Sequence, residues 1–325
     1  MKREVRVEDA VGMVLAHDLT KIVPGEFKGR LFQKGHVISE GDIDQLLAIG
    51  KEHIYVLSLE QGEVHEDDAA RRMAAAIAHS SLLFSEPNEG KVTVKAAHAG
   101  LLTIDVEALL AVNALGELAV VTKRTNSPVT EKQSVAGLRA IPLIVRDERL
   151  TAFETILTKT GPLLEILPFR RASVGIVTTG SEVYKGRIED RFGPVLRAKL
   201  QAYGAHWLGQ EIVDDATDVI AQAIDRLIDA GADIVLVTGG MSVDPDDRSP
   251  GAIAKAATEV VSYGMPMLPG SMSMLAYQHE VVLMGLPGCV IFDSVTAFDY
   301  LLPRVLAGQR LTGSDIAELG HGGLL

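Results

Sequence analysis

The sequence VGIVTTGSE, residues 174–182, is a run of apolar and β-branched residues that ends in a polar turn containing a glycine. The same change recurs in IVLVTGG, residues 234–240, and in VVLMGLPG, residues 281–288. Each run predicts a buried strand followed by a loop in which glycine permits a positive φ or the close approach of a ligand. Three such loops at one edge of a sheet would form a binding crevice.

Helical patterns follow the first two predicted strands. The second helix places four branched side chains on one face, at Ile220, Ile224, Leu227 and Ile228. Asp215 and Thr217 are its candidate N-caps, and Gly231 suits the position after its end. Because parallel strands need crossover connections, this alternation predicts an α/β fold: a three-layer αβα domain with a mostly parallel sheet. Ligands of such sheets bind at the carboxyl ends of the strands.

The length of 325 residues exceeds one ordinary core and predicts two or three domains. We expect a small α/β module at 1–58, a helix and β-rich module with a linker at 59–170, the αβα domain at 171–312 and a tail at 313–325. Amphipathic patterns predict helices with these bounds: 43–49, 67–84, 106–113 and 151–164.

Composition limits the class of protein. The net charge of −12 argues against a general nucleic-acid surface, although a local basic pocket for an anion is compatible with it. A single cysteine, Cys289, excludes an internal disulfide and a cysteine-rich metal site. No segment approaches the roughly 18 consecutive apolar residues of a membrane span, and residues 1–7 are not followed by an apolar signal region. We therefore expect a cytoplasmic protein without membrane association.

The first loop combines backbone N–H groups with hydroxyls. Thr179, Gly180 and Ser181 follow a strand directly, which is the composition of an anion-binding turn for phosphate. A Gly-Ser turn is also common without any ligand. Glu182 adds a carboxylate at the rim, where it is either part of the site or a solvated acid that stabilises a helix start.

The second loop is rich in carboxylates. Asp244, Asp246 and Asp247 lie within four positions, so they either spread into solvent or are collected by a cation. The cation that suits such oxygen ligands is Mg²⁺, which the carboxylates would share with substrate phosphates. Asp214 and Asp215 end the strand-like segment 208–213, and each either joins this edge or caps the next helix.

The third loop predicts a fixed backbone shape, because Gly285, Pro287 and Gly288 fall within four residues. Cys289 begins the following helix, where the dipole could lower its pKa. We favour a packing role for this cysteine, since no histidine is near it in the sequence.

Five motifs occur in a specific order: TTGSE at 178–182, the Asp pair at 214–215, TGGMSVDPDD at 238–247, PGS at 269–271 and GLPG at 285–288. Together they resemble the molybdopterin-binding domain of molybdenum cofactor biosynthesis proteins, over most of 171–312. Residues 5–57 resemble the opening of molybdopterin molybdenumtransferases, whose AxGxVLAxD and GD(x)I pieces match residues 10–18 and 41–43.

The resemblance implies a pterin dithiolene phosphate, free or adenylylated, held across these loops with Mg²⁺, and molybdate insertion or nucleotide transfer. It implies cofactor contacts from a set of loop residues: Thr179, Gly180, Ser181, Gly239, Gly240, Ser242, Ser271, Gly285, Pro287 and Gly288. Of these, Gly180 and Ser181 would hold the ligand phosphate, and Gly239, Gly240 and Ser242 would line the phosphate site. Asp214 or Asp215 would orient nucleotide or metal, Asp247 and Glu182 would be the catalytic acids, and Asp214 with Asp247 would hold the metal. The protein would supply positioning and charge neutralisation without a covalent nucleophile.

Four departures from the family pattern keep alternatives open. Ser271 stands where the family has a lysine, Cys289 and Val290 replace Asn-Pro, and Asp244 and Pro245 replace a Gly-Asp pair. The C-terminal domain common in molybdenumtransferases is not expected, because only about a dozen residues follow Leu311. The first hypothesis is a molybdenumtransferase-like enzyme. The second is a binding protein that delivers the cofactor to a molybdoenzyme, and the third is a nucleotide pyrophosphatase like the competence-damage-inducible proteins. Family members often self-associate, so we expect a homodimer and cofactor-synthesis partners.

Overall fold

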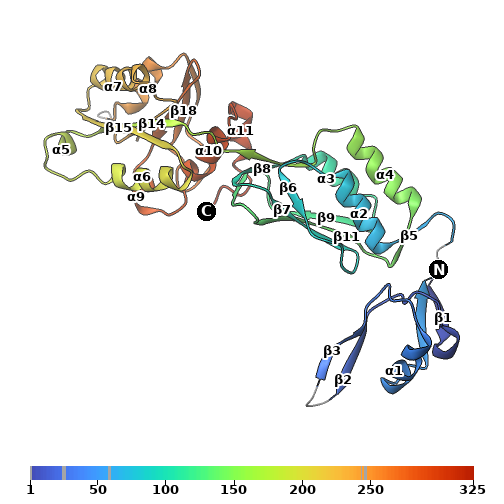
Figure 1. The fold of residues 1–325 in the computed structure, drawn as a ribbon. Helices are drawn as coiled ribbons and strands as arrows, with labels where there is room; N and C mark the ends of the chain where they lie inside the picture. The colour runs from blue at the N-terminus through green and yellow to red at the C-terminus, as the bar shows by residue number, and fades with distance from the viewer. Residues whose placement is uncertain (1, 24–26, 58–59, 243, 245–246) are drawn as a thin grey trace. The chain divides into compact units, whose positions relative to one another are not determined.

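The computed structural model describes every residue except 1, 24–26, 58–59, 243 and 245–246 (Figure 1). The chain divides into two compact units. Unit 1 consists of residues 1–95, 105–123 and 134–164, and unit 2 consists of residues 96–104, 124–133 and 165–325. The chain therefore passes between the units at five points, because each unit is built from three segments. Within the described residues no helix combines the length and hydropathy that crossing a bilayer requires.

Unit 1 begins with a small module that has its own core. Strand β1 (Lys2–Arg6) pairs antiparallel with β4 (His53–Leu57), and β2 (Leu19–Val23) pairs antiparallel with β3 (Phe27–Phe32). Helix α1 (Ile43–Ala48) follows a short 3₁₀ turn that Ser39 and Asp42 cap reciprocally. The helix predicted at 43–49 is confirmed. The core residues are apolar and come from every part of the module: Val7, Leu15, Ile38, Leu46 and Ile54.

The rest of unit 1 is a four-stranded sheet covered on one side by helices (Figure 1). The strand order is β6-β7-β11-β9, with these bounds: β6 Leu82–Phe84, β7 Lys91–Ala96, β11 Ser134–Ala140 and β9 Leu118–Thr122. Its helices are α2 Glu66–Ala76, α3 Val106–Asn113 and α4 Asp147–Thr158. A two-stranded pair, β5 Glu63–His65 with β12 Ile144–Arg146, lies at the start of α2.

The predicted helix at 106–113 is confirmed, whereas two other helices have different bounds. The helix predicted at 67–84 ends at Ala76, and residues 82–84 form β6. Phe84 is in phase with the predicted helix, but it lies in β6, where Leu82 and Phe84 are more buried than Leu83 between them. The helix predicted at 151–164 starts at Asp147 and ends at Thr158, before Gly161 and Pro162.

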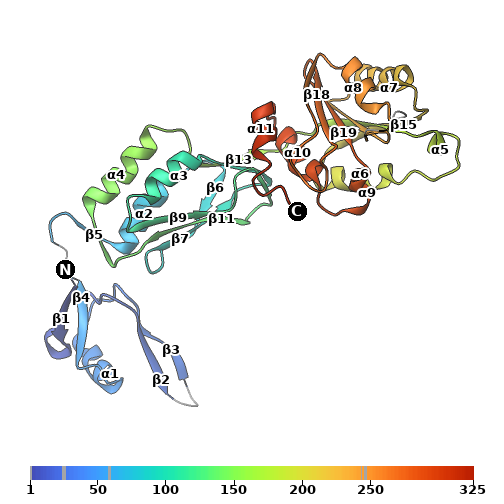
Figure 2. The same ribbon diagram turned by 180° about the vertical axis from the view of Figure 1, so that it is seen from behind.

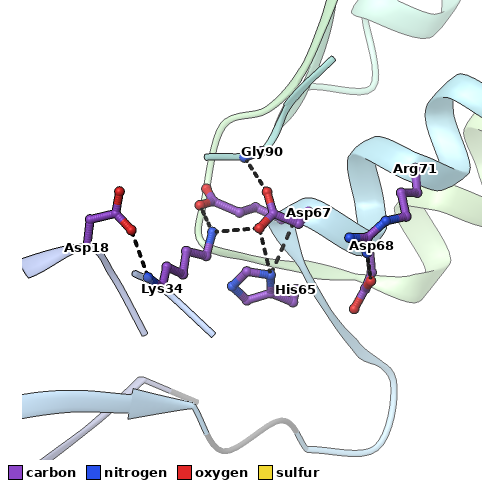
Figure 3. Close-up of polar contacts among 8 residues, drawn as sticks. Asp18, Lys34, His65, Asp67, Asp68, Arg71 and Gly90 are labelled. Atoms are coloured by element: carbon purple, nitrogen blue, oxygen red, sulfur yellow. Dashed lines mark hydrogen bonds and ion pairs between the residues drawn. The ribbon is translucent and has the colours of Figure 1, made fainter. Parts of the chain in front are cut away.

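A polar cluster at the start of α2 joins the first module to the rest of unit 1 (Figure 3). The Lys34 ammonium pairs with the Glu66 carboxylate and lies 3.6 Å from Asp67 Oδ2. The Lys34 side chain is only 6% exposed and that of Glu66 only 11%. Asp67 also accepts the Gly90 N–H at 2.8 Å, and His65 Nδ1 accepts the Asp67 N–H at 3.3 Å. The cluster is therefore a partly buried ion pair in which Asp67 also accepts a backbone hydrogen bond.

Unit 2 contains a six-stranded sheet, of which Figure 2 labels β15, β18 and β19. The strand order is β15-β14-β16-β19-β18-β17. The bounds are β14 Ser173–Thr179, β15 His206–Val213, β16 Ile234–Thr238, β17 Glu259–Tyr263, β18 Met274–Gln278 and β19 Val281–Leu286. The first four strands in this order are mutually parallel, and β18 is antiparallel to both of its neighbours. Every residue of β16 is buried, which explains its uninterrupted apolar sequence.

Helices cover both faces of this sheet. The helices α6 Phe192–Ala202 and α10 Ala297–Leu306 pack on one face, and α7 Thr217–Asp229 and α8 Ser249–Ala256 pack on the other. The expected face of α7 is confirmed, because Ile220, Ile224 and Leu227 are buried. The three-layer αβα architecture with a mostly parallel sheet is likewise confirmed.

Two further parts complete unit 2. Strands β8 Gly100–Ile104, β10 Ser127–Val129 and β13 Leu164–Pro168 form a three-stranded sheet in the order β10-β8-β13. The segment expected as a tail contains α11 Gly313–Glu318, which buries Ile316 and pairs Asp315 with Arg304. Near the end of the chain, Leu268 N–H donates to the Gly323 carbonyl and Leu325 N–H donates to the Leu268 carbonyl, both within 2.9 Å.

Candidate functional site

Parallel strands bring the predicted loops to one edge of the sheet in unit 2. The registers pair Thr179 with Val213 and Thr238 with Leu286, so β14, β15, β16 and β19 end at the same edge. Strand β17 also ends there, because it runs antiparallel to β18, which is antiparallel to β19. The pairing of Met274 with Gly285 brings the segment before β18, which contains Ser271, to this edge as well. All predicted site residues therefore lie on loops of this edge or on the strand ends beside them.

Three glycines shape the loops that follow the two central strands. The backbone torsion φ is 134° at Gly180, 85° at Gly239 and 55° at Gly240. Residues other than glycine rarely adopt such values. A Cβ at Gly239 would lie 2.3 Å from the Thr179 carbonyl oxygen. The loop that follows β16, which we call the β16 loop (described residues 239–242, 244, 247 and 248), is thus packed directly against the end of β14.

Ser249, which the sequence analysis did not single out, links these two loops. Its hydroxyl is fully buried, donates to the Gly239 carbonyl at 2.7 Å and lies 3.2 Å from Thr179 Oγ1. Its N–H donates to the Gly240 carbonyl at 3.2 Å. A serine before proline at a helix start is the only local signal for it, because its partners lie elsewhere along the chain. Ser249 fixes the conformation in which the amides of the β16 loop are presented.

The Asp pair after β15 has a different role from helix capping. Asp215 Oδ2 accepts the Ser181 N–H at 2.7 Å, and Asp214 Oδ1 accepts the Asp215 N–H at 3.0 Å. Helix α7 starts at Thr217 with Ala216 as its N-cap, without a side-chain hydrogen bond, so the capping roles predicted for Asp215 and Thr217 are wrong. The Ser181 amide, expected to contact phosphate, already binds a carboxylate. An anion at this edge must use other donors or displace Asp215.

The acids of the β16 loop are partly bonded to the loop itself. Asp247 N–H donates to the Asp244 carbonyl at 2.9 Å, and Asp247 Oδ2 lies 3.3 Å from the Asp244 nitrogen. Asp246 lies outside the described residues. Across the described part of the chain, no three His, Cys, Asp or Glu side chains come together as a metal site. Asp214 and Asp247 are suitable oxygen donors for Mg²⁺, which would need further oxygens from a bound phosphate.

The third loop combines packing with a rigid turn. Gly285 is buried under Met241, whose Cε would lie 2.3 Å from a Cβ at this position. Pro287 and Gly288 lead into the short helix α9 Cys289–Phe292. Burial and, to a smaller extent, the Asp293 carboxylate raise the pKa of the Cys289 thiol. The thiol thus stays protonated at neutral pH, as the packing role requires.

Three further residues complete the edge. Glu182 is exposed in the first turn of the short helix α5 Ser181–Tyr184. Ser271 is half-buried, and its carbonyl accepts the Met265 N–H at 2.8 Å. Tyr263, which the sequence did not single out, donates its hydroxyl to the β16 loop at the carbonyls of Met241 and Ser242.

Two family models match this chain. Residues 4–58 match a domain of unknown function (DUF8806), and residues 175–307 match the probable molybdopterin binding domain. The molybdopterin molybdenumtransferase of Synechococcus elongatus is 24% identical over 185 residues, which cover 54% of this chain and 46% of that protein. The molybdopterin molybdenumtransferase of Staphylococcus aureus strain MRSA252 is 29% identical over 135 residues, covering 38% of this chain and 31% of that protein. The chain thus spans less than half the length of these relatives.

Two solved structures are similar to part of this chain. The molybdopterin biosynthesis enzyme MoaB of Thermus thermophilus has 22% identity and a TM-score of 0.38, over 42% of this chain and 98% of that one. The tungsten cofactor synthesizing protein MoaB of Pyrococcus furiosus has 23% identity and a TM-score of 0.33, over 37% and 84% of the two chains. The family model covers β14 to α10, the strands and helices that build the edge described above. Residues 175–307 are therefore identified as a molybdopterin-binding domain.

Proposed function

We propose that the edge of unit 2 binds molybdopterin, free or adenylylated, and that the protein acts in molybdenum cofactor assembly. One observation carries this proposal within the segment that the family model matches. Gly180, Gly239 and Gly240, all with positive φ, end two adjacent central strands, and Gly239 leaves no space for a side chain. Such glycines let a phosphate approach the backbone N–H groups directly.

The remaining residues of the edge have roles consistent with a phosphate ligand. Ser242 is exposed and can add a hydroxyl donor beside Gly240. Asp214 and Asp247 would share Mg²⁺ with the phosphate oxygens, which supplies the ligands that two carboxylates alone lack. Glu182 and Ser271 would lie beside the molybdate, and Pro287 with Gly288 would form the floor of the crevice.

The step we propose is insertion of molybdate into adenylylated molybdopterin. The matched relatives are molybdopterin molybdenumtransferases, which supports this choice over other reactions of the same ligand. The protein would act by positioning the ligand and by neutralising charge, since Cys289 remains a thiol and no other nucleophile is needed.

Isothermal calorimetry with Gly240→Asp tests the binding site. The substitution places a negative side chain against the bound anion, so molybdopterin binding should be lost. Gly204→Asp is the matched control, because Gly204 also has a positive φ (69°), is exposed, and lies before β15 at the opposite edge of the sheet. Equal affinity in the two folded variants would contradict the placement of the site.

A turnover assay separates the proposed reaction from its alternatives. Release of AMP from adenylylated molybdopterin that depends on molybdate would support a transferase. Tight binding without turnover would support a delivery protein. Hydrolysis of nucleotides that contain no pterin, in the absence of molybdate, would support a pyrophosphatase instead.

A further inference from the structure

The β16 loop is attached to the sheet at a first point by Met241. This side chain is only 4% exposed and packs on Gly285 of β19. A Cβ at Gly285 would lie 2.3 Å from Met241 Cε and 2.9 Å from Ile253 Cδ1, so the glycine creates the space that Met241 fills. The loop is thereby held over β19, the strand next to β16.

The second attachment lies farther across the sheet, at Tyr263. Strand β17 is separated from β16 by β19 and β18, which corresponds to about 14 Å at the usual strand spacing. The Tyr263 hydroxyl lies 3.1 Å from the Met241 carbonyl oxygen and 3.2 Å from that of Ser242. It therefore shares its single hydrogen between two consecutive carbonyls of the β16 loop.

A loop that contains Gly239 and Gly240 has many accessible conformations, so ordering it during binding would cost affinity. Contacts that order the loop beforehand remove this cost. Tyr263 is 44% exposed; partial desolvation and, to a smaller extent, the negative charge of Asp247 raise the pKa of its hydroxyl, which therefore keeps its proton and remains a donor at neutral pH.

We propose that Tyr263 is a positioning residue of the ligand site: it holds the β16 loop in the conformation that binds the ligand phosphate. This inference rests on the proposed function, because it assigns a consequence for affinity to the loop of that site. Tyr263 acts through the carbonyls of Met241 and Ser242.

The test uses Tyr263→Phe in the full chain, which removes the hydroxyl and keeps the ring. Hydrogen exchange of residues 239–242 in the ligand-free protein should become several-fold faster, while exchange in β14 and β16 stays unchanged. Molybdopterin affinity in calorimetry should fall about three- to tenfold, the range expected for one hydrogen bond. In the turnover assay KM should rise while kcat stays unchanged. A purely structural defect would instead lower the apparent kcat, because a smaller fraction of the protein would be active.

Two further variants make the result decisive. Tyr203→Phe removes the same group after α6, at the opposite edge of the sheet, and should leave all three readouts at wild-type values. Gly285→Ala displaces Met241 from the other attachment and should also accelerate exchange of the loop; it serves if Tyr263→Phe does not fold.

The possible outcomes separate this inference from the proposed function. Wild-type exchange of the loop in Tyr263→Phe would overturn the inference, and so would faster exchange with unchanged affinity and KM. If the wild-type protein binds no molybdopterin, the proposed function fails together with the consequence for affinity. Exchange in the ligand-free protein then still decides whether Tyr263 holds the loop.

Discussion

Gly239 combines two constraints that can be separated by substitution. Its φ of 85° disfavours any side chain, and a Cβ would collide with the Thr179 carbonyl oxygen at 2.3 Å. Gly231 has a similar φ of 93° but open space around it. We expect Gly231→Ala to lower the free energy of unfolding by about 1–2 kcal/mol, the cost of a left-handed backbone. Gly239→Ala should lower it by more than about 3 kcal/mol, because backbone atoms must also move.

Urea denaturation of both variants measures this difference. An equal loss of unfolding free energy in the two variants would mean that the backbone at the end of β14 can move at little cost. The close contact between the β16 loop and Thr179 would then not constrain the loop.

Asp247 is the acid whose role depends most on the metal. If it holds Mg²⁺ together with Asp214, Asp247→Asn should weaken Mg²⁺-dependent binding of molybdopterin far more than binding measured in EDTA. Calorimetry in the two buffers gives the comparison. A parallel loss in both would assign Asp247 to the structure of the loop, in line with its bonds to Asp244.

A substitution at Ser271 tests whether serine in place of the family's lysine weakens anion binding. A lysine at this half-buried position would place an ammonium near the bound oxyanion, which is worth about 1–3 kcal/mol. Ser271→Lys should therefore bind molybdate or tungstate more tightly at low salt, and the gain should shrink as salt increases. A folded variant without any gain would show that residue 271 faces away from the anion.

At the scale of elements, the start of α2 depends on a neutral histidine. His65 caps the helix through Nδ1, which accepts the Asp67 N–H, and His65 Nε2 is buried without a hydrogen-bond partner among the described residues. Burial and, next, the Lys34 ammonium lower the pKa of His65 from 6.5, against the opposing effect of Glu66, Asp67 and Asp68. The fold therefore favours the uncharged ring.

The sign of the pH effect follows from this lowered pKa. The contribution of His65 to stability is fully present above pH 6.5 and is lost as pH falls through the lowered value. His65→Asn keeps a capping oxygen without titrating in this range. Between pH 7.5 and 5, the free energy of unfolding in urea should fall more steeply for the wild type than for His65→Asn. Identical slopes would show that His65 does not couple to folding.

Elements that depend on local sequence were the most predictable. The apolar runs of β14, β16 and β19 and the buried face of α7 are visible because their periodicity is set by neighbouring residues. The same local pattern misplaced the end of α2, because an alanine-rich helix and the short strand β6 follow each other without a strong breaker. Helix signals also suggested a cap at Asp215, whereas this carboxylate is held by the distant Ser181 amide.

The position of the predicted site residues at one edge of the sheet was predictable, because these residues lie in the loops after the strands. Glycines and acids in these loops are visible in the sequence, since strand ends of a parallel sheet must converge. Ser249 and Tyr263 were not, because their importance comes from partners that lie elsewhere along the chain, at Thr179 and Met241. Hydrogen bonds between segments that are distant in the sequence do not produce a periodic pattern of residue types.

At the scale of the whole molecule, the small sheet β10-β8-β13 is completed by segments that are distant in sequence. Gly100 of β8 packs so closely on β13 that a Cβ would lie 2.2 Å from the Leu167 carbonyl oxygen. A fragment of residues 165–325 lacks β8 and β10, so the strand β13 loses its partner. We expect this fragment to unfold at lower urea than unit 2 does in the full chain, and hydrogen exchange of residues 165–167 to be faster in it. Equal protection of β13 in the fragment would contradict this role of β8.

Because the chain passes five times between the two units, recombination within the gene is restricted. Recombination at a single breakpoint cannot exchange either unit intact, because three segments of unit 1 alternate with three segments of unit 2. Most breakpoints between residues 95 and 165 would separate strands from their pairing partners. We therefore expect the two units to be inherited together, because the loss of either would require three separate deletions.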